Sequence, residues 1–140
     1  MGIILCPTRG GPASSHTQNG AIALAKERGD SLLFLYVVDL HFLNKTAAPI
    51  VVDVADEVQE MGEFLLLIAK ERAEEQGVST KTISRIGKLR EEIKKVAREE
   101  SVSLVMFGQP AGEKSKFILD DLRAFAAEIE KDCGIETTIY

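Results

Sequence analysis

Short runs of apolar residues alternate along the chain with longer segments in which apolar residues recur every three or four positions. Three of the short runs, at residues 3–6, 32–38 and 104–107, are continuously apolar, which is typical of parallel strands buried on both faces. Two weaker runs, at residues 80–86 and 135–140, alternate apolar and polar residues, as strands nearer the edge of a sheet do. The pattern therefore predicts five strands.

The segments between these runs have the spacing of amphipathic helices. The first helix is expected at about residues 14–28, and each later one is expected to bury a single apolar stripe. Gly29, Gly77 and Gly134 directly follow helical segments, where a left-handed residue commonly ends the helix. The expected stripes are Met61, Leu65, Ile68 and Ala69, then Leu89, Ile93, Val96 and Ala97, then Ile118, Leu122, Phe125, Ala126 and Ile129.

Strict alternation of strand and helix predicts an α/β fold. We expect one doubly wound domain over residues 1–140, with a five-stranded parallel sheet and four helices on its two faces. Ligands of such sheets bind beyond the carboxyl ends of the strands, where the strand order reverses. We expect the reversal between the first and fourth strands, so the loops at residues 7–15 and 108–116 would meet there.

One connection is unusually long. Residues 39–54 mix apolar and polar side chains with no clear period, and the helical pattern becomes regular only from Val58. Long irregular connections are commonly lids or interface segments. The sequence leaves both roles open.

Composition and charge exclude several classes of function. The net charge is −5 and no basic cluster is present, which argues against a nucleic-acid partner. No apolar run approaches the roughly 20 residues that a membrane span requires. Cys6 and Cys133 form no CxxC pair, so we expect no disulfide framework and a reducing cytoplasm. The apolar start lacks a preceding basic region and predicts a strand rather than a signal peptide.

No common catalytic motif follows the predicted strands. The chain lacks GxxxxGK[ST] and GxGxxG, and the first strand ends in "CPTR", where a receiver domain has carboxylates. His16 and His41 have no partner at metal-ligand spacing, so no metal is expected. The two cysteines have no evident base partner. We therefore predict no catalytic residue.

The loop after the first strand is the best candidate for a ligand contact. Its sequence "TRGGPASS", residues 8–15, places two glycines and two hydroxyls before a helix. Backbone N–H groups at a helix N-terminus, together with the helix dipole, favour an anion. Arg9 would add a charge-assisted contact. The alternative is a turn in which a serine caps the helix.

Local strings along essentially the whole chain resemble the universal stress protein family. They include "IILCPTRGG", "AIALAKERGDSLLFLYVVD", "AKERAEEQGVSTKTISRIG" and "EEIKKVAREESVSLVMFG", in the family's order and spacing. The resemblance implies a small cytosolic protein with the adenine nucleotide alpha hydrolase-like fold, which dimerises by antiparallel pairing of its last strands. The homodimer interface expected here consists of Ile135, Thr137, Thr138, Ile139 and Tyr140.

The chain departs from the ATP-binding members of that family. Those members resemble one another in an aspartate after the first strand and in the signature G-x2-G-x9-G-[ST] after the fourth, where glycine lets backbone amides approach phosphate. Here Arg9 stands in place of the aspartate, and after Gly108 the next glycine, Gly112, comes one position late. No glycine lies between Gly112 and Gly134. The segment thus resembles the non-ATP-binding universal stress protein A type.

Three functions remain open from the sequence. The leading one is a non-catalytic stress-response or regulatory homodimer with a degenerate nucleotide site, no cofactor, and a protein as its further partner. The second is a switch that binds ATP, AMP or another anion through the loop after the first strand. The third is an adenylating enzyme, whose loop SGGxDS is only partly matched by "RGGPAS". The candidate ligand contacts are Pro7, Thr8, Arg9, Gly10, Gly11, Ser14, Val38, Gly108, Gln109, Gly112 and Ser115.

Overall fold

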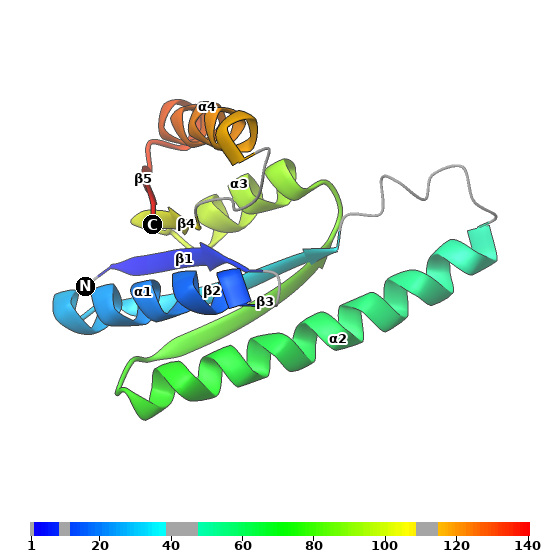
Figure 1. Ribbon diagram of the computed structural model, residues 1–140, viewed down its shortest axis with the longest axis horizontal. Helices are drawn as coiled ribbons and strands as arrows, with labels where there is room; N and C mark the ends of the chain where they lie inside the picture. The colour runs from blue at the N-terminus through cyan, green and yellow to red at the C-terminus, as the bar shows by residue number, and fades with distance from the viewer. Residues whose placement is uncertain (1, 9–11, 39–47, 109–114) are drawn as a thin grey trace.

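A computed structural model gives the fold. It describes residues 2–8, 12–38, 48–108 and 115–140, with side chains described except at 12–13, 48–56 and 115–118. Within these residues strands and helices alternate as the sequence predicts (Figure 1). The elements are β1 (Ile3–Pro7), α1 (Pro12–Arg28), β2 (Ser31–Val38), α2 (Ala48–Glu75), β3 (Thr80–Ile86), α3 (Leu89–Glu99), β4 (Leu104–Phe107), α4 (Ser115–Cys133) and β5 (Glu136–Ile139).

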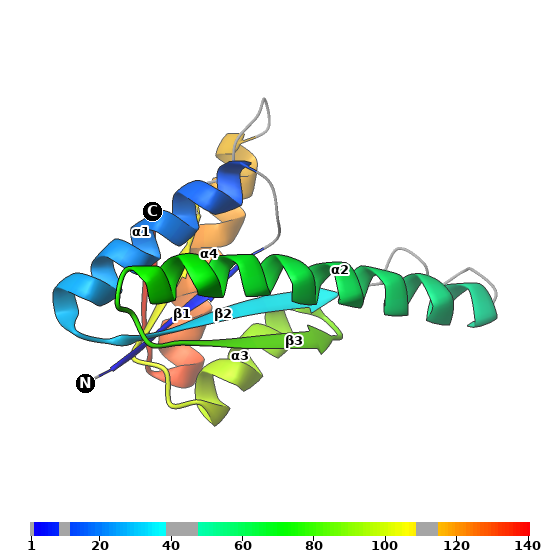
Figure 2. The same ribbon diagram turned by 90° about the horizontal axis from the view of Figure 1, so that it is seen from below.

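The five strands form one parallel sheet in the order β3-β2-β1-β4-β5. β1 lies at its centre, with Leu5 opposite Leu33 on β2 and Val105 on β4. The strand order reverses between β1 and β4, which confirms the predicted place of the reversal. β3 is at an edge, as its weaker alternating pattern indicates. Helices α1 and α2 cover one face of the sheet, and α3 and α4 cover the other (Figures 1 and 2).

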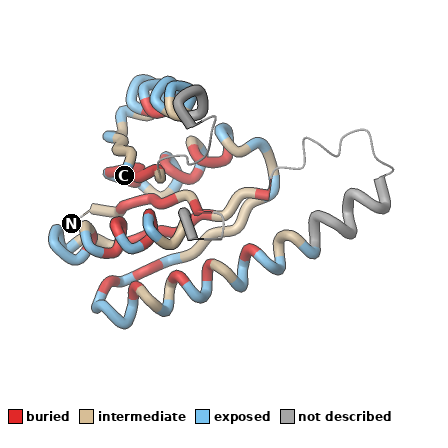
Figure 3. The backbone as a smooth tube through the Cα atoms, in the orientation of Figure 1, coloured by how far each residue is buried: buried red, intermediate tan, exposed pale blue. Residues whose placement is uncertain are grey.

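Two apolar layers hold these helices to the sheet, because neighbouring residues of a strand point to opposite faces. Ile4, Cys6 and Phe34 are fully buried in the layer under α1 and α2. Leu5 and Leu35 are fully buried in the layer under α3 and α4. Buried residues are concentrated in the central strands and on the helix sides that face them (Figure 3). Among the described residues, no helix is long and apolar enough to cross a membrane.

Helix α2 begins earlier than the sequence indicates. The expectation of an irregular connection up to residue 54 is wrong from Ala48 onward, where the backbone is already helical. The β-branched run "IVV" has a low helix propensity and hides the helical period, whereas Pro49 fits the first turn of a helix. α1 likewise begins at a proline, Pro12. Residues 39–47 lie outside the described part of the chain.

The stripe expected to be buried on α2 is also wrong. Met61 and Ile68 are 62% and 42% exposed, whereas the side facing the sheet carries Gly62, Leu66, Ala69 and Ala73. Small residues allow the helix to lie close to the sheet, and a search for large apolar residues overlooks them. The ring of Tyr36 occupies the space where a side chain at position 62 would be.

The other two stripes agree with the structure. Ile93, Val96 and Ala97 of α3 are buried, with Leu89 partly buried beside them. Phe125, Ala126 and Ile129 of α4 are buried, Leu122 is partly buried, and the side chain of Ile118 is outside the described residues. The three glycines predicted to end helices have positive φ angles, as expected of that position: Gly29 at 70°, Gly77 at 81° and Gly134 at 67°.

Candidate functional site

The candidate site lies where the strand order reverses, at the ends of β1 and β4 and beside α1. Thr8 follows β1, is buried, and donates its N–H to the Leu35 carbonyl at 2.8 Å. Its Oγ1 accepts a hydrogen bond of 2.6 Å from Nε2 of Gln18, which is also buried. Gly108 follows β4, and a side chain there would collide with Oγ1 of Thr17 on α1. Thr8 and Gly108 therefore pack against neighbouring residues of α1, Gln18 and Thr17.

The remaining predicted ligand contacts are placed only in part. Pro7 ends β1, and Ser14 is half-buried in the first turn of α1. Val38 ends β2, and its carbonyl accepts the N–H of Gly87 at 3.0 Å. Ser115 is the first residue of α4, and its side chain is not described. Arg9, Gly10, Gly11, Gln109 and Gly112 lie outside the described residues, so their roles stay predictions.

A polar connection leads from the crevice to α2. Arg72 donates from Nη2 to Oε1 of Gln18, the same residue that contacts Thr8. The Nε of Arg72 is buried and has no hydrogen-bond partner within the described part of the chain. Lys26 and Glu27 of α1 and Arg72 and Glu75 of α2 line an adjacent groove between the two helices. Because its charges balance, this groove does not by itself select an anion.

The last residue of the chain packs beside the crevice. Tyr140 donates its N–H to the Phe107 carbonyl at 2.7 Å, and its ring stacks on His16 with 4.9 Å between ring centres. The ring also fills the space next to Gly20 on α1. The sequence analysis missed this contact. The sequence feature that indicates such a contact is an isolated glycine inside a helix, because Gly20 and Gly62 each face a tyrosine ring.

The structure places both cysteines. Burial raises the pKa of the Cys6 thiol to about 12, so the thiol stays protonated at neutral pH and is not a nucleophile. Cys133 is a half-buried free thiol at the end of α4. In the described ranges no group of three histidine, cysteine or acidic side chains is placed to hold a metal ion.

Strand β5 forms the second edge of the sheet. Ile135, Thr137, Thr138 and Ile139 are half-buried and Tyr140 is 46% exposed. Because the Tyr140 N–H points toward β4, alternation along the strand directs the N–H groups of Thr137 and Ile139 outward.

A single carboxylate lies over this outward-facing backbone. The Thr137 N–H donates to Oε1 of Glu130 at 3.2 Å, and the Thr137 hydroxyl donates to the same oxygen at 2.8 Å. Glu130 belongs to α4, the helix that precedes the strand. One outward N–H of β5 is therefore paired within the chain.

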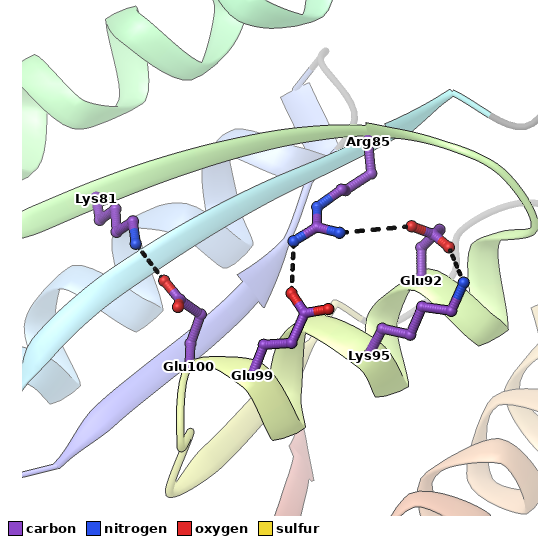
Figure 4. A network of polar contacts seen from close by, with 6 residues as sticks. All are labelled: Lys81, Arg85, Glu92, Lys95, Glu99 and Glu100. Carbon is purple, nitrogen blue, oxygen red and sulfur yellow. Dashed lines mark hydrogen bonds and ion pairs between the residues drawn. The ribbon is translucent and has the colours of Figure 1, made fainter.

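A network of ion pairs joins β3 to α3 at the opposite edge (Figure 4). Arg85 contacts Glu99 at 2.6 Å and Glu92 at 3.9 Å, and Lys95 contacts Glu92 at 3.2 Å. Lys81 pairs with Glu100. The charges are matched, so the network serves to attach the strand to the helix.

The chain resembles known proteins in sequence and in fold. The sequence profile of the universal stress protein family matches residues 1–121. The universal stress protein UspA from Lactobacillus plantarum superposes with a TM-score of 0.80 at 15% identity, covering 99% of this chain and 96% of that chain. No curated protein sequence matches the chain.

Two similar structures contain nucleotides. A universal stress protein in complex with cAMP has a TM-score of 0.69 at 16% identity, covering 99% of this chain and 96% of that chain. The universal stress protein from Archaeoglobus fulgidus in complex with dAMP has a TM-score of 0.63 at 11% identity, with coverage of 99% and 96%. At these identities the likeness shows the fold alone.

Proposed function

The chain belongs to the universal stress protein family, and from this premise we propose that it acts as a non-catalytic regulatory homodimer whose nucleotide crevice has degenerated. The protein would work by contacting other proteins rather than by transforming a substrate. The proposal has two parts, the state of the crevice and the dimer, which are tested separately.

The packing of Gly108 against Thr17 is the observation that carries the first part. Gly108 is the one glycine of the family's phosphate signature that stands in place, and its close packing against the Thr17 hydroxyl gives a structural reason for a glycine there. Its retention therefore does not imply a bound phosphate.

The test of the first part is a calorimetric titration of the protein with ATP and with AMP. We expect no binding heat at millimolar nucleotide. Stoichiometric binding of either nucleotide at micromolar concentration contradicts a degenerate crevice.

The outward backbone of β5 supports the second part. An antiparallel partner strand centred on Thr138 would place Thr137 opposite the partner's Ile139, and the reverse, so that both pairs exchange backbone hydrogen bonds. Covering an edge in this way also removes a template for aggregation. Native mass spectrometry of the purified protein at micromolar concentration should show twice the mass of one chain.

A second candidate function is a switch that binds a nucleotide or another anion at the loop after β1. The specific observation in its favour is that structurally similar universal stress proteins hold cAMP and dAMP. Arg9 would contact the phosphate of such a ligand. The switch predicts that cAMP or AMP raises the melting temperature and that Arg9→Ala abolishes the rise. Stabilisation that survives Arg9→Ala places the ligand elsewhere.

A further inference from the structure

Helix α2 leaves large apolar side chains in solvent. Six large apolar residues in the described part of the chain are substantially exposed, and four of them belong to α2: Met61, Phe64, Leu67 and Ile68. Met61 and Phe64 are 62% and 64% exposed. Scattered exposed apolar residues are ordinary, but a concentration on one helix marks an interaction surface.

The spacing of these residues is that of a helix that binds another helix. Val58, Met61, Leu65 and Ile68 follow one another at intervals of three, four and three residues. We call these four residues the seam. Alternating intervals of three and four are the heptad pattern by which one helix packs along another.

The seam is separate from the side of α2 that holds the helix to the sheet. That side consists of Gly62, Leu66, Ala69 and Ala73, and all four residues are buried. Along the seam Met61 and Ile68 are exposed, while Val58 and Leu65 are half-buried. The helix thus has two apolar sides, and the sheet uses one of them.

The length of α2 leaves room for a partner. Its 28 residues span about 42 Å, whereas the seven residues of β3 beside it span about 23 Å. The helix consequently continues past the ends of β2 and β3 (Figures 1 and 2). At its other end the heptad series reaches Arg72 and Glu75, which line the groove between α1 and α2. A helix bound to the seam can therefore end in this groove.

The charged residues of α2 indicate which kind of helix can bind to the seam. Between residues 57 and 75, α2 carries six exposed glutamates against two basic residues, Lys70 and Arg72. Glu57 and Glu71 directly flank the seam in the heptad register. Two copies of α2 packed antiparallel would bring these like charges together, which disfavours self-association through this surface.

We propose that the seam is a docking site for an amphipathic helix of another protein, one that carries apolar residues at heptad spacing and lysines or arginines beside them. This inference rests on the proposed function, since it supplies the surface by which a non-catalytic protein contacts a partner. The apolar residues give the contact area, and the glutamates select a basic partner.

The test uses designed peptides and fluorescence anisotropy. The first peptide is a 21-residue helix with leucines at the heptad positions and lysines beside them. The second has the same composition in shuffled order, and the third has glutamates in place of the lysines. We expect the first to bind about tenfold or more tightly than either of the others.

Matched protein variants assign the binding to the seam. The double variant Met61→Lys and Ile68→Lys should lose binding by about tenfold or more, because it places charge in the apolar contact. Leu67→Lys is the control, since Leu67 is 52% exposed but lies outside the seam, and it should bind like the parent. Equal melting temperatures of the variants ensure that folded proteins are compared.

Three results overturn the proposal. The first is equal binding of the ordered and shuffled peptides, which indicates general attraction to an acidic protein. The second is unchanged binding by the double variant. The third is a dimer that dissociates in the double variant, because the seam is then a contact between copies of this chain. Calorimetry with nucleotides and the mass of a variant altered in β5 test the proposed function independently of these results.

Discussion

The two edges of the sheet are protected in different ways. β3 has seven residues; Arg85 attaches it to Glu99 of α3, and Lys81 attaches it to Glu100, the C-cap of that helix (Figure 4). β5 has four residues, and the carboxylate of Glu130 pairs with one outward N–H of its backbone. Charged side chains on an edge strand discourage pairing with another chain. One edge therefore carries paired charges, while the other is the edge at which we propose a symmetric partner strand.

The largest expected effect comes from proline at the outward edge of β5. Ile139→Pro removes an outward-facing N–H without removing a hydrogen bond to β4, so the protomer folds and the proposed dimer is lost. We expect dimerisation to weaken by about a hundredfold or more. Native mass spectrometry across a dilution series measures the change, and circular dichroism verifies the fold.

Ser84→Pro is the matched control on the opposite edge. The Gly87 N–H points toward β2, so alternation along β3 directs the Ser84 N–H outward as well. We expect this variant to dimerise like the parent. A loss of dimer in Ser84→Pro, or a retained dimer in Ile139→Pro, reverses the assignment of the two edges.

A smaller effect, on the stability of the fold, is expected when an ion pair between β3 and α3 is removed. Arg85→Ala removes one of the two cations that contact Glu92, whose side chain is 10% exposed. The remaining described partner of Glu92 is then Lys95, which is more exposed than Arg85. The free energy of unfolding should fall by about 1–2 kcal/mol, because a partly desolvated carboxylate loses its cation. Urea denaturation measures the change. Lys81→Ala, at a 65% exposed side chain, should stay within about 0.5 kcal/mol of the parent, and equal losses in both variants contradict a special role of Glu92.

The smallest effect on stability is expected when the Glu130 carboxylate is removed. Glu130→Ala releases the Thr137 N–H and hydroxyl, and the protomer should lose about 1 kcal/mol of stability. The same change frees a backbone donor for the partner strand, so the dimer should tighten by about fivefold. Analytical ultracentrifugation measures the dissociation constant. A weaker dimer indicates that Glu130 contributes to the interface instead of competing with it.

Most of the fold could be predicted from hydrophobic periodicity. The run at residues 104–107 coincides with β4, and the run at residues 80–86 coincides with β3 and was correctly placed at an edge. The run at residues 104–107 is recognisable because a short continuous apolar segment is typical of a parallel strand buried on both faces, and the run at residues 80–86 because alternation is typical of a strand near an edge. Family membership, predicted from ordered strings along the chain, is confirmed by the match over residues 1–121.

Helix α2 shows where the same reasoning fails. Large apolar residues suggested that Met61 and Ile68 are buried, but the sheet is contacted by Gly62, Ala69 and Ala73. Close packing favours small residues at such a contact, and periodicity of large residues cannot detect it. A helix with two apolar sides also gives two competing stripes, and the sequence alone does not say which one meets the sheet.

The candidate site was predicted less completely than the fold. The convergence of Thr8 and Gly108 followed from the strand order, but the links to Gln18 and Arg72 depend on side-chain directions across two helices. The stacking of Tyr140 on His16 joins the last residue to the first helix and has no local sequence signal beyond Gly20. Contacts between segments so distant in the chain become visible only once the fold is known.

The central position of β1 has a consequence for synthesis of the protein. Its β4 side is completed by residues about a hundred positions later, as the contact between Ile3 and Ser103 illustrates. At ordinary translation rates about 5–20 s separate the emergence of these two segments from the ribosome. During that interval β1 and β2 can already pair, while the other side of β1 has no strand to cover it. The β4 side of β1 is therefore open to other contacts until the later segment has been synthesised.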